Sequence, residues 1–118
     1  MQKEKRYNLE DRTLAFAKTV RAFVKALPKS ISNQEDGRQV VRSSGSVGAN
    51  YIEANEALSK KDFLLRMKIC RKEAKESRYW LRLMDIGSDA GLQKDRDGLI
   101  QEATELMSIF GSIIRKSE

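Results

Sequence analysis

The chain has 118 residues, which is enough for one hydrophobic core and too few for two, so we expect a single domain over residues 1–118. Hydrophobic residues make up 40% and charged residues 34%, as is typical of a globular protein, and the net charge is +6. The lack of histidine excludes Ser-His and Cys-His nucleophile pairs, and the single cysteine, Cys70, excludes an intrachain disulfide.

The first predicted helix covers residues 9–27. Asn8 is a favourable N-cap, and Pro28 ends the helix because the residue before a proline avoids the α region. Apolar side chains recur at alternating spacings of four and three along this segment, which predicts one buried face: Leu9, Thr13, Phe16, Val20, Phe23 and Leu27.

The core of the second predicted helix is residues 39–58. Its apolar seam includes Val40, Val47 and Leu58 and continues through two glycines, Gly45 and Gly48, which would let a neighbouring backbone approach closely. Each interior glycine disfavours a helix by about 1 kcal/mol relative to alanine. A strand–turn–strand over residues 40–52 is therefore the alternative; we favour the helix because the seam is unbroken.

Ser59 caps the third predicted helix, which extends to about Ser88 and is ended by Gly91. The fourth covers residues 95–116. Four helices of similar length with short connections predict an all-α, antiparallel up-and-down four-helix bundle.

Basic residues gather on the third helix. Residues 60–82 hold nine basic and three acidic groups, so their net charge of +6 equals that of the whole chain. At 100° per residue, six of the cations fall within an arc of about 120° that points away from the apolar seam. These six residues, called the basic arc below, are Lys68, Arg71, Lys72, Lys75, Arg78 and Arg82. The arc is interpreted either as a solvated face, as a surface for nucleic-acid phosphates, or as a docking face for an acidic protein.

The opposite flank of the third helix carries Ile69, Trp80 and Leu83. We interpret this apolar flank either as a wide core contact or as an interface between subunits, where tryptophan is enriched. On the second helix, Arg42, Ser46 and Glu53 share one face with Asn50 nearby, which predicts a network of salt bridges and hydrogen bonds between helices.

Other motifs in the chain give no catalytic or metal site. Residues 43–48 lack the order of a phosphate-binding loop, and residues 94–98 lack the acidic residues that a calcium loop needs. Cys70 lies in an apolar seam and is interpreted as a core residue. No pair of acidic residues is placed for acid–base catalysis, so we expect no enzymatic activity, metal or cofactor.

The stretch at residues 41–84 resembles the bacterial family called 23S rRNA intervening-sequence proteins. The resemblance rests on Arg42, Ser46, Asn50 and Glu53, followed by a helix opened by Ser59-Lys60-Lys61-Asp62-Phe63. The chain departs from many members at Arg12, where they carry tryptophan, and at Ala54, where they carry glycine. The resemblance implies an antiparallel bundle that assembles into a homo-oligomer, a pentameric ring, with no established enzymatic activity.

Together these features predict an oligomeric, non-enzymatic protein that binds RNA, with an adaptor for an acidic protein as the alternative. No signal peptide and no apolar segment long enough to cross a membrane occurs in the sequence, so we expect a cytoplasmic protein.

Overall fold

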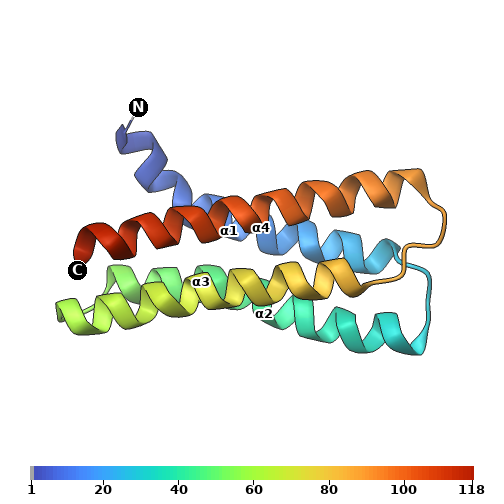
Figure 1. Cartoon of the computed structure of the whole chain (residues 1–118), viewed down its shortest axis with the longest axis horizontal. Helices are drawn as coiled ribbons and strands as arrows, with labels where there is room; N and C mark the ends of the chain where they lie inside the picture. Colours follow the sequence, from blue (N-terminus) through green and yellow to red (C-terminus); the bar gives the residue numbers. More distant parts are fainter. Residues whose placement is uncertain (1) are drawn as a thin grey trace.

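Four helices make up the computed structural model, which describes the backbone of residues 2–118 and the side chains of residues 9–118. They are α1 (Gln2–Ala26), α2 (Ile31–Asn55), α3 (Lys60–Leu83) and α4 (Ala90–Ser117), and no strand occurs within this range. Successive helices run antiparallel, and α1 also packs beside α4 (Figure 1). The predicted all-α four-helix bundle is confirmed.

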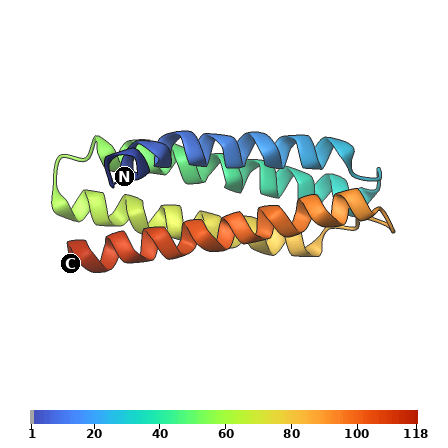
Figure 2. The ribbon, with the colours of Figure 1, turned by 90° about the horizontal axis from the view of Figure 1, so that it is seen from above.

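The two ends of the bundle carry different loops. The termini and the α2–α3 loop lie at one end, and the α1–α2 and α3–α4 loops lie at the other, as Figure 2 also shows from above. Packing is most extensive between α2 and α3 and between α3 and α4, and least extensive between α1 and α4. Among residues 2–118, no helix is both long enough and apolar enough to cross a membrane.

The predicted apolar seams form the core. Val20, Val47, Met67 and Phe110, one from each helix, are fully or almost fully buried. The second helix continues through Gly45 and Gly48, so the helical interpretation is confirmed and the strand–turn–strand alternative is wrong.

The boundaries of α1 and α2 differ from the predicted ones. Helix α1 already begins at Gln2, so Asn8 lies within it and is not its N-cap; the side chain of Asn8 lies outside the described ones. Helix α2 begins at Ile31, because the Ser30 hydroxyl caps it by accepting a hydrogen bond from the backbone N–H of Asn33 at 3.1 Å. The helix ends at Asn55, and Leu58, predicted in the seam, is fully exposed in the loop that follows.

The predicted boundary between the third and fourth helices is also wrong. Ser59 caps α3 as predicted, but α3 ends at Leu83, and α4 begins at Ala90 with Asp89 as its N-cap. Gly91 therefore lies in the first turn of α4, and Gly87, with φ of 65°, makes the turn between the helices.

A side chain from the first turn of α2 holds this turn in place. The amide of Asn33 in α2 donates hydrogen bonds to the carbonyl oxygens of Pro28 and Asp85 at 2.8 Å each, and its oxygen accepts one from the backbone N–H of Asp85 at 3.0 Å. These bonds satisfy the backbone groups of Asp85 outside a helix, so the chain leaves α3 at this point.

Candidate nucleic-acid interface

The six cations of the basic arc all lie on α3, and α3 presents them away from the buried seam. Five are exposed, and Arg78 is half-buried beside α4. Serine capping at Ser59 and a seam that runs unbroken from Phe63 to Leu81 give α3 a regular register, so residues spaced by three and four stay aligned along its length.

Most of these cations have no acidic partner. Lys68 Nζ lies 4.0 Å from Glu118 Oε2, and Arg78 donates a hydrogen bond to the hydroxyl of Thr104 in α4 at 3.2 Å. The other four form no salt bridge with any side chain of residues 9–118. Uncompensated like charges on one helix face produce a positive local potential that attracts anions.

Two of the three acidic residues of α3, Glu73 and Glu76, contact α2 instead. Glu76 Oε1 accepts a hydrogen bond from Arg42 Nη2 at 2.9 Å, and Glu73 Oε1 lies 3.7 Å from Arg42 Nη1. Because one α2 arginine compensates both carboxylates on this side, the cations on the other side of α3 remain unneutralised. The pairing of α2 with α3 thus produces the one-sided charge of α3.

Of the predicted polar network, Arg42, Ser46 and Asn50 make contacts at the α2–α3 boundary, with partners that the sequence analysis missed, whereas Glu53 takes no part. Asn50 donates to the hydroxyl of Ser46 at 3.0 Å and accepts from Arg66 Nη1 at 3.1 Å. Glu53 is exposed and makes no hydrogen bond with another described side chain. Arg66 and Glu73 are seven residues apart, about two helical turns, so both lie at the same edge of the apolar seam. This spacing was the sequence signal that could have identified them as contacts to α2.

The apolar flank is only partly covered. Trp80 packs against the core, Ile69 is half-buried, and Leu83 is 52% exposed. The Trp80 Nε1 atom is buried without a hydrogen-bond acceptor among the described residues. Leu65, which the sequence analysis did not include, is 54% exposed on the same side of α3, as its 18-residue separation from Leu83 indicates.

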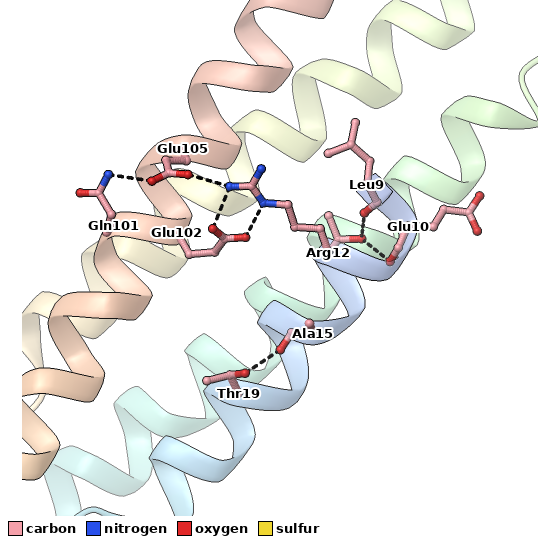
Figure 3. A network of polar contacts seen from close by, with 9 residues as sticks. Leu9, Glu10, Arg12, Ala15, Thr19, Gln101, Glu102 and Glu105 are labelled. Carbon is pink, nitrogen blue, oxygen red and sulfur yellow. Dashed lines mark hydrogen bonds and ion pairs between the residues drawn. The ribbon is translucent and has the colours of Figure 1, made fainter. Parts of the chain in front are cut away.

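A separate charged cluster joins α1 to α4. Arg12 donates two hydrogen bonds to Glu102, at 2.7 and 2.9 Å, and one to Glu105 at 2.7 Å (Figure 3). These bonds raise the pKa of Arg12, Glu102 contributing most, while the Gln101 amide and then Arg12 lower the pKa of Glu105. Every charge in this cluster has a partner, so it closes the least packed side of the bundle and is a structural contact.

Cys70 and the acidic side chains of the described residues are not arranged as a nucleophile site or a metal site. Cys70 is fully buried, and desolvation raises the pKa of its thiol to about 12. Within the described part of the chain, no three carboxylate or thiol side chains are grouped as a metal site. Cys70 is the core residue that its position in the seam predicted.

Comparison with known proteins gives one family match and a related solved structure. A sequence model described as "23S rRNA-intervening sequence protein" matches residues 5–112. A crystal structure of a protein with unknown function from the S23 ribosomal protein family of Bacteroides thetaiotaomicron is 29% identical, with a TM-score of 0.71. The alignment covers 89% of this chain and 96% of that one. No curated protein matches the chain. The family match includes all of α2 and α3, which carry the network and the basic arc.

Proposed function

Because this chain belongs to the 23S rRNA-intervening sequence protein family, we propose that it is a non-enzymatic, oligomeric, cytoplasmic protein that binds RNA through the basic arc of α3. The observation that carries the proposal is the set of uncompensated cations on one helix face, while the carboxylates of Glu73 and Glu76 are ion-paired with Arg42 of α2. Phosphate groups are the natural ligands of such a face, since arginine binds them with two parallel hydrogen bonds.

Binding through phosphates would recognise shape and charge more than sequence. The arc contains no asparagine or glutamine that could read the edge of a base, so we expect weak sequence preference. Each phosphate that the arc neutralises releases counterions, and affinity should therefore fall steeply with salt concentration.

We further propose that the apolar flank joins subunits of a homo-oligomer, a pentamer. Three half-exposed apolar side chains on one helix would promote aggregation if no partner covered them. A ring would repeat the basic arc and increase avidity for a long RNA.

The binding experiment compares two variants of equal net charge. The arc variant carries Arg71→Gln, Lys75→Gln, Arg78→Gln and Arg82→Gln, and the control carries Lys18→Gln, Lys25→Gln, Lys94→Gln and Lys116→Gln on α1 and α4. Fluorescence anisotropy with a hairpin RNA should show wild-type binding whose log affinity falls by about 0.7–0.9 per phosphate for each tenfold rise in salt. The arc variant should lose binding, and the control should keep most of it.

Two results would contradict the proposal. Equal losses in both variants would mean that net charge, not the arc, binds RNA. Absence of salt-sensitive binding by the wild type would favour the adaptor that docks an acidic protein. Circular dichroism and light scattering should first check that both variants keep the helices and the assembly of the wild type.

The assembly is tested with two exposed leucines of nearly equal accessibility. Leu83→Glu in the apolar flank should dissociate the oligomer, whereas Leu14→Glu on α1, 53% exposed in the wild type, should not. Light scattering of the wild type should give about five times the chain mass of 13.5 kDa. A wild-type monomer at micromolar concentration would refute the assembly.

A further inference from the structure

An exposed aromatic side chain lies among the cations of the basic arc. Tyr79 is 57% exposed, and no hydrogen bond joins its hydroxyl to another described residue. On a helix of 100° per residue, Tyr79 points about 20° from Lys72 and about 60° from Arg82, and Lys75 lies one turn before it. Lys72, Lys75 and Arg82 are all exposed, so the ring stands between positive groups along the face of α3.

The orientation of this ring is set by its neighbour. Tyr79 and Trp80 meet edge to face, with ring centroids 5.0 Å apart and planes inclined by 75°. Trp80 is itself packed against the core, so it supports Tyr79 from one side only. More than half of the Tyr79 surface stays open beside the cations.

A single exposed aromatic residue is common on protein surfaces and needs no ligand to explain it. The surrounding charges are what distinguish Tyr79. A phosphate-binding surface that also offers an aromatic ring has the two components with which proteins hold single-stranded nucleic acid, a positive track for the backbone and a platform for a base.

We propose that Tyr79 stacks on an unpaired base of the RNA whose phosphates the basic arc binds. The inference rests on the proposed RNA binding and specifies the ligand, which is a loop, bulge or single-stranded segment. A regular RNA duplex keeps its bases stacked inside, and its deep, narrow major groove does not admit side chains; splayed bases of a loop reach a ring on a convex helix. Since every base has a π-face, stacking adds affinity without adding sequence preference.

Spacing along α3 supports this arrangement. Lys75 lies about 6 Å before Tyr79 along the helix axis and Arg82 about 4.5 Å after it, at a rise of 1.5 Å per residue. Flexible cationic side chains at these positions can reach the phosphates on both sides of one stacked nucleotide. An acidic peptide would pair with the same cations but need not offer a flat group to stack on the Tyr79 ring. RNA therefore explains both the cations and the exposed ring.

The experiment measures three variants against three nucleic acids. The variants are Tyr79→Leu, Tyr79→Phe and, as a control, Leu14→Ala, which removes a side chain of similar exposure on α1, away from the arc and the apolar flank. The nucleic acids are an RNA hairpin with an unpaired loop, an RNA duplex with the same number of phosphates, and the hairpin sequence as DNA. We expect Tyr79→Leu to weaken hairpin binding by about 5- to 100-fold and to leave duplex binding and the salt slope unchanged. Tyr79→Phe and Leu14→Ala should bind like the wild type.

A second readout detects the stacking directly. A 2-aminopurine base in the loop should lose fluorescence when the wild type binds and keep it with Tyr79→Leu, and a weaker response in the DNA hairpin would identify RNA as the preferred source of the base. This signal is measured on the wild type, so it tests the inference even if Tyr79→Leu does not fold.

The outcomes separate the two proposals. If the wild type binds RNA in a salt-sensitive way but 2-aminopurine does not respond and Tyr79→Leu binds the hairpin normally, the stacking role is refuted and the phosphate-binding role stands. Equal weakening of hairpin and duplex by Tyr79→Leu would also refute stacking. Failure of the wild type to bind any of these nucleic acids would refute both.

Discussion

Helices α1 and α2 approach each other closely at Gly48. A Cβ atom at this position would lie 2.9 Å from Thr13 Oγ1 and 3.2 Å from Thr13 Cβ. Thr13 is 1% exposed, and its hydroxyl donates a hydrogen bond to the carbonyl oxygen of Leu9 at 2.8 Å, so it cannot move aside without loss. Gly48→Ala should therefore force α1 and α2 apart.

Two opposing terms determine the effect on stability. Adding a methyl group to this packed contact should destabilise by about 1–3 kcal/mol. Alanine in place of glycine in a helix stabilises by about 1 kcal/mol, which partly conceals the clash. Gly98 in α4 provides the control because a Cβ there meets no atom within 4 Å, so Gly98→Ala should gain the helix propensity alone.

Comparing the two alanine variants removes the propensity term. Gly98→Ala should be more stable than Gly48→Ala by about 1–3 kcal/mol, or about 4–12 °C in Tm at the roughly 4 °C per kcal/mol of a domain this size. Urea and thermal unfolding followed by circular dichroism at one protein concentration measure the difference. Adding Thr13→Ala to Gly48→Ala removes Oγ1, so the pair should couple favourably in a double-mutant cycle. Equal stability of the two glycine variants would refute the close approach of α1 and α2.

Three further predictions follow from other contacts. Asn33→Ala should destabilise by about 2–3 kcal/mol in urea because it removes three part-buried hydrogen bonds, two to Asp85 in the α3–α4 loop and one to Pro28, whereas the exposed neighbour Gln34→Ala should change little; equal effects would contradict the role of Asn33. Glu105 has a lowered pKa, chiefly through its bond from Gln101, so its contribution is present above the unfolded-state pKa and is lost as pH falls through the lower folded-state pKa. Stability should therefore fall below about pH 4.5, the ordinary value for this group, and less steeply in Glu105→Gln; identical pH profiles would argue against the contact. Cys70, with a pKa of about 12, should react with iodoacetamide at pH 8 only after unfolding, and rapid labelling of the native protein, measured by mass spectrometry, would contradict its burial.

Local patterns in the sequence were sufficient for the fold class and for the direction of the charges. The spacing of Met67, Cys70 and Ala74 predicted which side of α3 is buried, and the basic arc followed from the same 3.6-residue period. Ser59 as N-cap was also predictable, because capping depends on a side chain and a backbone N–H three residues apart. These features need only the geometry of one helix.

Contacts between distant segments required the tertiary structure. The start of α2 carried the same local signal as that of α3, since Ser30 caps it through the backbone N–H of Asn33. The end of α3 could not be predicted in this way, because the bond of Asn33 to Asp85 joins segments 52 residues apart. The bond between Arg12 and Glu102 joins residues 90 apart. Helical periodicity indicates which face of a helix is buried, but the partner on the facing helix depends on how the two helices are shifted along each other. Arg42 therefore meets Glu73 and Glu76 only because antiparallel packing sets the register of α2 against α3.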